Sequence, residues 1–219
     1  MWVVVVAFAL ALEMTQPARV RIVAMGDSTT AGTPAFKSPR EAPPSGRGDE
    51  TSQYAYWLMK AHPEWEVLNR GVNGERSDQI RARFARDVLD VKPALVIIIA
   101  GVNDIYQGRS AADVIEELQA MYEAASHAGI RVVAGSIVPF NTATADQNVR
   151  MRAVNTWIQR HALKDGNLTF VDTRRAVAHS DNPDALADSP DELHPSADGY
   201  RRMGEAVRSA VERMLKYPT

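Results

Sequence analysis

A run of seven apolar residues, Ala-Leu-Val-Ile-Ile-Ile-Ala at 94–100, limits the folds open to this chain more than any other segment. Because the run has no polar side, both faces of the strand that it predicts must be buried. Strands buried on both faces are typical of parallel sheets, whose crossover connections place helices on each side. The run therefore predicts a central strand of a parallel sheet covered by helices.

Other short apolar segments predict further strands, and amphipathic segments lie between them. Strands are expected at 20–25, 66–69, 94–100, 130–137 and 168–171. Helices are expected near 78–90, over 111–127, around 154–161 and from about 200 to 214. Ser110 and Asp113 resemble a capping box for the second helix, and Gly129 stands where that helix should end. This alternation of strands and helices predicts an α/β domain with a parallel sheet.

Composition excludes several classes of function. The chain has 25 Lys and Arg against 27 Asp and Glu, so it lacks the basic excess of a general nucleic-acid binder. It has no Cys, which excludes disulfides, thiolate metal sites and a Cys nucleophile. No other metal-binding spacing is present, and we expect no metal and no cofactor. Its 219 residues suit a single domain, which we place at 20–219.

The N-terminal segment 1–19 contains the most apolar stretch of the chain, at 2–12. That stretch is too short for a stable membrane span, which needs about 20 apolar residues. Ala9-Leu10-Ala11 has the form of a signal-peptidase site, but no Lys or Arg precedes the apolar run. Two interpretations stay open: an incomplete signal-like segment, or an apolar arm packed on the domain or on a second subunit. The sequence also leaves open whether the protein forms a homo-oligomer through this arm. It does not decide whether the protein is secreted, periplasmic or cytoplasmic.

Polar or glycine-rich segments follow the predicted strands or precede the last helix. They lie at 26–32, 69–74, 101–104 and 191–195. In open α/β sheets, ligands bind outside the carboxyl ends of the strands, so these segments should meet at one edge. Together they contain a hydroxyl, an imidazole, a carboxylate, an amide and glycines that leave backbone N–H groups accessible. These are the groups that acyl transfer through a serine nucleophile needs.

The four segments resemble the conserved blocks of the SGNH hydrolases, also called the GDSL esterase/lipase family. The first reads Gly-Asp-Ser-Thr where the family name has Leu, and the second matches at Gly74. The third is Gly-x-Asn-Asp at 101–104, and the fourth is Asp-x-x-His-Pro at 191–195. They occur in the family's order from residue 21 to about 200. The resemblance implies a flavodoxin-like three-layer α/β/α sandwich with a central, mainly five-stranded parallel sheet.

The resemblance also implies a role for each matching residue. Ser28 is the nucleophile, His194 the general base and Asp191 the carboxylate that orients the imidazole. The backbone N–H groups of Ser28 and Gly74 and the side-chain amide of Asn103 form the oxyanion hole. The implied activity is that of a serine esterase, which hydrolyses a small-molecule or carbohydrate ester through an acyl-enzyme.

Each of these residues has a structural alternative as well. Ser28 could cap a helix, Gly74 could serve backbone geometry alone, and the pair Asp191 and His194 could start the last helix. Asn103 with Asp104 could form a turn. We expect purely structural roles, through local hydrogen bonds, for three other carboxylates: Asp27, Asp104 and Asp172.

Two other functions compete with the esterase. A flavodoxin-like module could hold a phosphate or FMN at the Ser/Thr-rich turn 26–32, but this leaves Asn103 and the Asp191–His194 pair without a role. A non-catalytic, carbohydrate-binding relative of the esterases is the second alternative, and the complete set of catalytic residue types argues against it.

The acyl group is expected to be short. Specificity should lie in the irregular, proline-rich segment 31–52 and in the segment 138–148, because long loops in compact domains are usually functional. These segments contain few large apolar residues, chiefly Phe36, Val138 and Phe140. This favours a shallow site for acetyl or butyryl esters over a tunnel for long chains.

Overall fold

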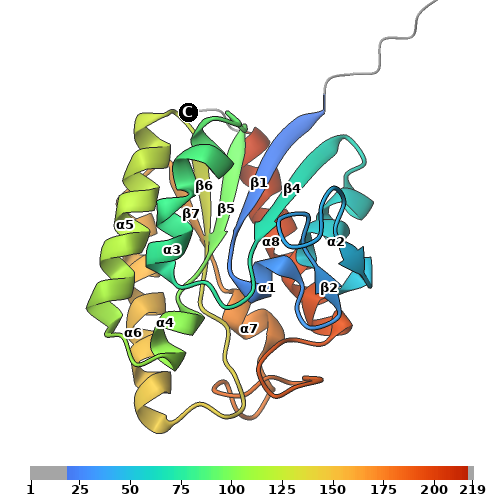
Figure 1. Ribbon diagram of the computed structural model, residues 1–219. Coiled ribbons are helices and arrows are strands. Elements are labelled where there is room, and N and C mark those ends of the chain that lie inside the picture. The colour runs from blue at the N-terminus through green and yellow to red at the C-terminus, as the bar shows by residue number, and fades with distance from the viewer. Residues whose placement is uncertain (1–18, 217–219) are drawn as a thin grey trace, which may run out of the picture.

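The computed structural model describes residues 19–216 (Figure 1). The predicted arm at 1–19 therefore lies almost wholly outside the described residues. Within 19–216, none of the helices is both long and apolar enough to cross a membrane.

A five-stranded parallel sheet forms the centre of the molecule, as predicted. Its order is β4-β1-β5-β6-β7. The strands are β1 (Val20–Gly26), β4 (Trp65–Gly71), β5 (Leu95–Ile99), β6 (Arg131–Gly135) and β7 (Leu168–Val171). All five lie at the predicted positions, with ends that differ by no more than two residues. The predicted apolar strand is β5, whose side chains are buried on both faces.

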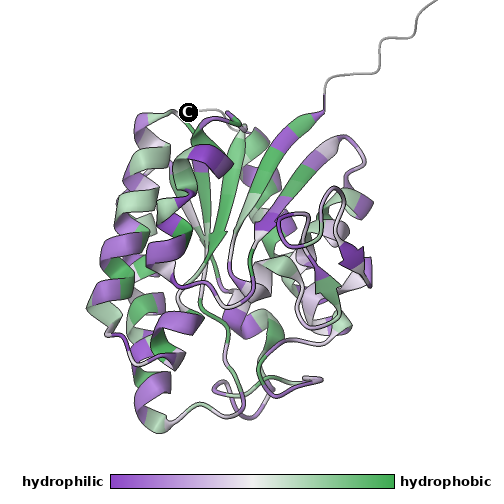
Figure 2. Ribbon diagram, viewed as in Figure 1, coloured by the Kyte–Doolittle hydropathy of each residue, from purple (hydrophilic) through white to green (hydrophobic). Residues whose placement is uncertain are grey.

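Helices cover both faces of this sheet and complete the three-layer sandwich (Figure 1). One face packs against α3 (Ser77–Ala82), α5 (Ala111–His127) and α6 (Ala145–Ala162). The other packs against α2 (Tyr54–Ala61) and α8 (Ala197–Lys216). Alternate residues of β5 divide between the two cores: Val96 and Ile98 face the first, and Ile97 and Ile99 the second. Figure 2 shows the apolar strands enclosed between helices whose outer faces are hydrophilic.

The capping box predicted for α5 is present. The Ser110 hydroxyl accepts a hydrogen bond from the backbone N–H of Asp113 at 3.2 Å, and the Asp113 carboxylate accepts one from the N–H of Ser110 at 2.9 Å. The helix ends at His127, and Gly129 adopts a positive φ of 69° just beyond it. Glycine takes this left-handed conformation without steric cost, which explains the end of the helix.

The prediction of a single helix near 78–90 was wrong, because the structure divides this segment into two elements. α3 ends at Ala82, and a π-helical turn, η2, follows over Ala85–Leu89. The break lies at Arg83, whose side chain is buried and bonded to backbone carbonyls at the ends of β1 and β4. A buried guanidinium needs hydrogen-bond acceptors for its N–H groups. The backbone acceptors of Arg83 lie on β1 and β4, and the helix is interrupted where its side chain reaches them.

The segment 31–52 is more ordered than its irregular sequence indicated. It contains a two-residue antiparallel pair, β2 (Phe36–Lys37) with β3 (Arg47–Gly48), and a short 3₁₀ turn, η1 (Glu50–Ser52). The Ser38 hydroxyl donates to the carbonyl of Gly71 at 2.6 Å. The Glu41 carboxylate accepts the N–H of Asn73 at 3.1 Å. These bonds fasten the segment to the end of β4.

The turn after β1 forms a short helix, α1 (Ser28–Ala31), whose cap is Asp27. The Asp27 carboxylate accepts the N–H of Thr29 at 2.9 Å. The alternative in which Ser28 caps this helix is therefore wrong. α1 also touches Gly71 of β4 so closely that a Cβ at Gly71 would collide with the backbone of Ala31.

The last helix, α8, is hydrogen-bonded to the segment that follows α1. The Tyr200 hydroxyl of α8 donates to the carbonyl of Thr33 at 2.8 Å. α8 begins directly after Ser196, whose hydroxyl accepts the N–H of Gly199 at 3.2 Å. Ser196 thus caps α8, and the alternative in which Asp191 and His194 start this helix is wrong.

Asp27 is a buried acid with an altered pKa. Burial raises its pKa from 3.8 to about 7, although hydrogen bonds from Thr29 oppose the change, and the nearby charge of Asp104 adds to it. Burial costs the ionised form its hydration, so the folded protein favours the protonated acid. The unfolded chain releases this proton near pH 4, and the folded protein releases it near pH 7. The free energy of unfolding therefore falls as the pH rises between these values.

Asp27→Asn should therefore stabilise the protein at pH 8 and have little effect near pH 4. Asn caps helices about as well as Asp and has no charge to bury. The difference in free energy of unfolding should grow between pH 4 and pH 7 to at most roughly 4 kcal/mol. Urea unfolding of both proteins across this range measures it. A difference that stays constant with pH would contradict the raised pKa.

Candidate active site

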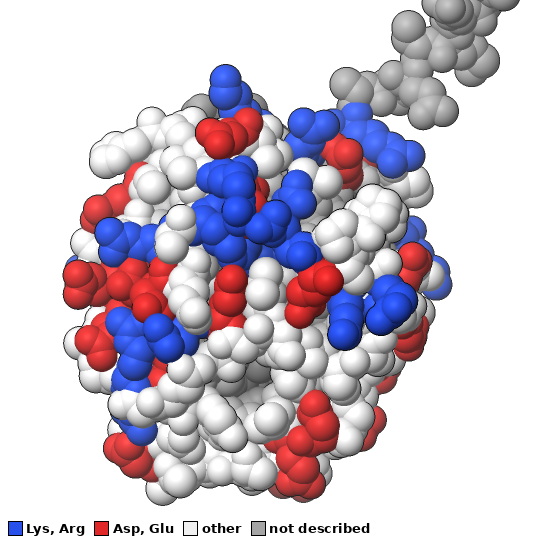
Figure 3. Space-filling model, in the orientation of Figure 1, with Lys and Arg blue, Asp and Glu red and all other residues white. Residues whose placement is uncertain are grey.

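The predicted site segments meet in one pocket at the carboxyl ends of the strands. The pocket has a volume of about 130 Å³. It is lined by Ser28, Thr29, Asn73, Val102, Asn103, Tyr106, Phe140, Leu193 and His194. Figure 3 shows a hollow at this end of the molecule, surrounded mainly by uncharged residues.

Ser28 is the first residue of α1 and lines the pocket, and it is almost fully buried. Its backbone N–H donates no hydrogen bond to any other residue in 19–216. This is expected for the first turn of a helix, whose N–H groups have no partner within the helix. The N–H is therefore available to an oxygen atom in the pocket.

His194 and Asp191 form a hydrogen-bonded pair within one turn. The His194 Nδ1 and the Asp191 Oδ2 are 2.7 Å apart. The other carboxylate oxygen accepts the backbone N–H groups of His194 at 2.9 Å and Leu193 at 3.1 Å. Burial raises the pKa of Asp191, but these hydrogen bonds outweigh it, so its pKa lies below the ordinary value. Asp191 is therefore ionised at neutral pH and holds the imidazole in place.

Ser28 and His194 share the pocket without a direct bond. Within the described part of the chain, the Ser28 hydroxyl makes no hydrogen bond to the His194 ring. Asp191 occupies Nδ1, so Nε2 is the ring nitrogen left for another partner. Contacts of this kind are often long in proteins without substrate and shorten when substrate binds.

Asn103 lies in α4 (Val102–Tyr106), so the alternative in which Asn103 and Asp104 form a turn is wrong. The Asn103 Nδ2 donates to the backbone carbonyl of Glu75 at 2.9 Å. Because a carbonyl can only accept, this contact fixes which end of the amide faces Glu75. The amide has a second N–H, and Asn103 lines the pocket.

Gly74 lies next to the pocket, between Asn73, which lines it, and Glu75. Gly74 is not itself among the lining residues. Its φ is 79°, and a Cβ there would meet no other atom within 4 Å, so the backbone conformation alone favours glycine. Its N–H donates to no other residue of 19–216. Both the structural alternative and the predicted role are compatible with this position.

Asp104 and Asp172 have structural partners, as expected, although those of Asp104 are not local. The fully buried Asp104 carboxylate accepts the N–H and the hydroxyl of Ser77, each at 2.8 Å. Arg109 donates to it at 2.8 Å. Burial raises its pKa although these hydrogen bonds and the charge of Arg109 oppose the change. Asp172 accepts the N–H of Arg175 at 2.9 Å and caps α7 (Thr173–Val177).

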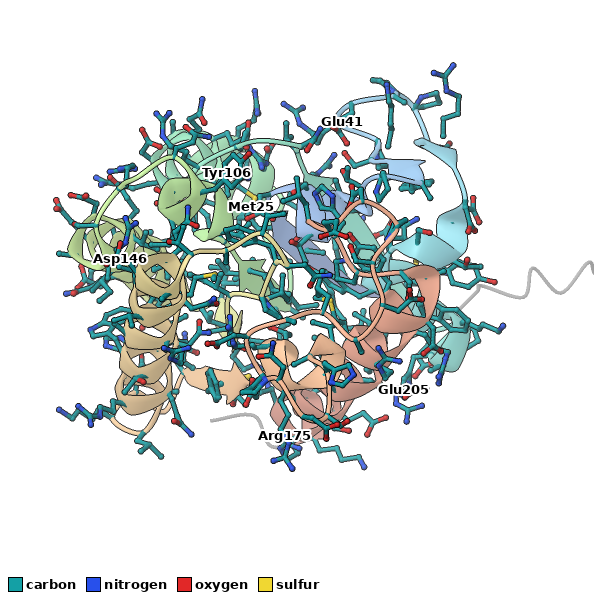
Figure 4. All side chains as sticks on the ribbon, turned by 90° about the horizontal axis from the view of Figure 1, so that it is seen from below. Met25, Glu41, Tyr106, Asp146, Arg175 and Glu205 are labelled. Atoms are coloured by element: carbon teal, nitrogen blue, oxygen red, sulfur yellow. The ribbon has the colours of Figure 1, made fainter. Side chains whose placement is uncertain are left out.

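An apolar wall completes the pocket, and most of it was not predicted. Tyr106 packs edge-on against Phe140 with ring centroids 5.7 Å apart, and 56% of the Tyr106 surface is exposed. Val102 and Leu193 are further apolar residues that line the pocket. In Figure 4, which looks onto this end of the molecule, Tyr106 lies toward the edge and Met25 further inside. Tyr106 follows Asn103 by three residues, a spacing that places both on one side of a helix and could have revealed it.

Within the described residues, no three His, Asp or Glu side chains gather in a way that could hold a metal ion. The groups that surround the pocket are a hydroxyl, an imidazole paired with a carboxylate, an amide, and backbone N–H groups that have no partner within 19–216. Acyl transfer through a serine uses groups of these kinds.

Known proteins resemble this chain in both sequence and fold. The acetylxylan esterase of Geobacillus stearothermophilus is 27% identical over 169 residues, which are 70% of this chain and 76% of that protein. Subunit alpha1 of platelet-activating factor acetylhydrolase IB from Bos taurus is 24% identical over 152 residues, 68% of this chain and 65% of that protein.

Solved structures share the fold. A member of the lipolytic protein G-D-S-L family from Veillonella parvula DSM 2008 matches with a TM-score of 0.71 at 20% identity, over 90% of this chain and 99% of that one. The model of the GDSL-like Lipase/Acylhydrolase family matches residues 24–202, and this range contains all four segments singled out in the sequence. The chain therefore belongs to the GDSL-like Lipase/Acylhydrolase family, and it is a carboxylic ester hydrolase.

Proposed function

We propose that this hydrolase cleaves short-chain esters through an acyl-enzyme on Ser28, with His194 as general base and Asp191 as its partner. The observation that carries this proposal is the 2.7 Å hydrogen bond between Asp191 and His194 beside a pocket that Ser28 also lines. An ionised carboxylate on Nδ1 stabilises the cationic imidazole that forms when His194 takes a proton.

The reaction has two halves. In the first, the Ser28 Oγ attacks the ester carbonyl and its proton passes to His194 Nε2. The tetrahedral intermediate then breaks the bond to the leaving oxygen, which takes the proton from His194 and departs as the alcohol, and the acyl group stays on Ser28. In the second half, His194 deprotonates a water molecule that attacks the acyl-enzyme. The second tetrahedral intermediate then breaks its bond to the Ser28 Oγ, which takes the proton from His194, and the carboxylic acid leaves.

The negative oxygen of each tetrahedral intermediate needs hydrogen-bond donors already in place. We assign this role to the backbone N–H groups of Ser28 and Gly74 and to the Asn103 amide. The two N–H groups lack acceptors among residues 19–216, and one N–H of Asn103 is held by Glu75 while the other is left for the oxygen. Donors fixed before the reaction are worth more than donors that must reorient.

The acyl group should be short because the pocket is small. Its volume of about 130 Å³ lies below the 300–1,000 Å³ that is usual for pockets of drug-sized ligands. The names of both relatives refer to the acetyl group and differ in the alcohol, which is xylan in one case. The exposed Tyr106 ring beside the pocket suits the flat face of a sugar, so acetylated saccharides are our preferred substrates.

A phosphate or FMN site at 26–32 has less support. The Thr29 N–H, which a phosphate would need, is already bonded to the Asp27 carboxylate. The Thr30 hydroxyl lies 3.2 Å from the Tyr54 hydroxyl in the core. The turn thus offers a carboxyl group where a phosphate would need donors.

Ser28→Ala should lower turnover of p-nitrophenyl acetate by about 10⁶, by analogy with other serine triads. Ser126→Ala is the matched control, since Ser126 lies on the exposed face of α5 and far from the pocket in the fold. Initial rates of both variants and the parent measure the effect. A Ser28→Ala variant that hydrolyses the ester at the parent rate would falsify the assignment of the nucleophile.

Asn103→Ala should lower kcat by about 10²–10³, the usual loss when one oxyanion donor is removed. KM should change little, because the donor acts mainly on the charged intermediate. Gln119→Ala, on the exposed side of α5, is the control for loss of an amide. An unchanged kcat would remove Asn103 from the oxyanion hole and leave the roles of Ser28 and His194 standing.

A series of p-nitrophenyl esters from C2 to C16 should give its highest kcat/KM at C2 to C4, because longer chains exceed the pocket. Acetylated xylo-oligosaccharides assayed in parallel test the alcohol, and we expect acetate release from them. A maximum at C12 or longer would contradict the assignment of a short acyl group.

A further inference from the structure

Arg83 is a buried arginine below the loop that follows β4, and only 8% of its side chain is exposed. Its Nη2 donates to the carbonyl of Gly26 at 3.0 Å, and its Nη1 donates to that of Arg70 at 2.8 Å. These carbonyls lie at the carboxyl ends of β1 and β4, the strands that precede Ser28 and Gly74. Two carboxylates balance the buried charge, Asp87 at 2.8 Å and Glu75 at 2.7 Å.

Glu75 connects this arginine to the proposed oxyanion hole. Its side chain accepts the Arg83 Nε, while its backbone carbonyl accepts the Asn103 amide at 2.9 Å. Glu75 also follows Gly74 directly, so its position sets that of the Gly74 peptide. One residue thus contacts one proposed oxyanion donor and is covalently joined to another.

The rest of the loop is held on either side of Glu75. Glu41 accepts the N–H of Asn73, and Asp104 accepts the N–H of Ser77 at 2.8 Å. Figure 4 shows Glu41 on the outer part of segment 31–52, at the same end of the molecule as Tyr106. Asn73 and Ser77 are thus held by Glu41 and Asp104. Among these contacts, only the bond from Arg83 acts on Glu75, which lies between them.

We infer that Arg83, acting through Glu75, is a positioning residue for the oxyanion hole. The pair fixes the carbonyl of Glu75, which orients the Asn103 amide, and fixes the peptide that presents the Gly74 N–H. Oxyanion donors must lie about 2.7–3.1 Å from the developing charge, and a displacement of about 1 Å can cost 10²-fold in rate. This inference rests on the proposed function, because it assumes that Gly74 and Asn103 serve an oxyanion.

The sharpest test changes Glu75 and not Arg83, because loss of the buried guanidinium could unfold the protein. Glu75→Ala leaves the Arg83 Nε without its acceptor and should lower kcat about tenfold, with KM within about twofold of the parent value. Glu75→Gln keeps an oxygen that accepts the Nε hydrogen bond and should retain at least about a third of the parent kcat.

Arg86→Met is the matched control. Arg86 also pairs with Asp87, at 2.9 Å, but it is exposed and, among the described residues, makes no hydrogen bond or ion pair with Glu75. Its kcat and KM should equal those of the parent. If Glu75→Ala keeps the full kcat, or if its loss appears in KM alone, Arg83 and Glu75 have a structural role only and the inference fails.

A double variant separates positioning from general damage. If Glu75 acts through the same hole as Asn103, adding Glu75→Ala to Asn103→Ala should lower kcat by less than about threefold more, because coupled residues are not additive. Losses that multiply in full would overturn the role of Glu75 in orienting the Asn103 amide.

Ser28→Ala, assayed alongside, distinguishes this failure from failure of the proposed function. Full activity of Ser28→Ala would reject the serine mechanism itself. Loss of activity in Ser28→Ala together with an unaltered Glu75→Ala would reject only the role of Arg83 and Glu75.

Discussion

The main-chain pairing of β1 between β4 and β5 determines where every group of the site can lie. Parallel strands end at the same edge, and Gly26 pairs there with Gly71 on one side and Ile99 on the other. Neither position has room for a side chain. A Cβ at Gly26 would collide with the carbonyl of Ile99, and a Cβ at Gly71 would collide with the backbone of Ala31. α1 can therefore begin directly at the sheet edge, and Ser28 lies within the fold instead of on a projecting loop.

The carboxyl groups near the site differ in pKa because their surroundings differ. Asp27 and Asp104 are buried, and burial raises the pKa of each. Asp191 is less buried and accepts three hydrogen bonds, which hold its pKa below the ordinary value. The arrangement leaves a negative charge beside His194, where it would stabilise the cation of the proposed mechanism. It reduces negative charge at Asp27, next to the serine, where an oxyanion would be repelled.

Local patterns predicted much of the fold, and long-range polar contacts explain what they missed. The five strands and α5 with its Ser110 cap follow from apolar periodicity and capping chemistry, which are properties of short segments. The break at Arg83 does not, because a charged residue gives no sequence signal that it will be buried against distant carbonyls. The anchoring of segment 31–52 by Ser38 and Glu41 was missed for the same reason. The site segments were found because strand ends converge, but the Glu75–Asn103 contact that orients the amide has no pattern of its own.

The hydrogen bond from Tyr200 to Thr33 joins residues 167 positions apart, and it shows that segments distant in the sequence meet in the fold near α1. Asp191 and His194 follow Ser28 by 163 and 166 positions, so Ser28 is synthesised well before them. A growing chain on the ribosome therefore carries the proposed nucleophile before it has the base that is proposed to activate it. If Ser28 and His194 have the proposed roles, ester hydrolysis can begin only after the segment that carries Asp191 and His194 has left the ribosome and packed beside Ser28.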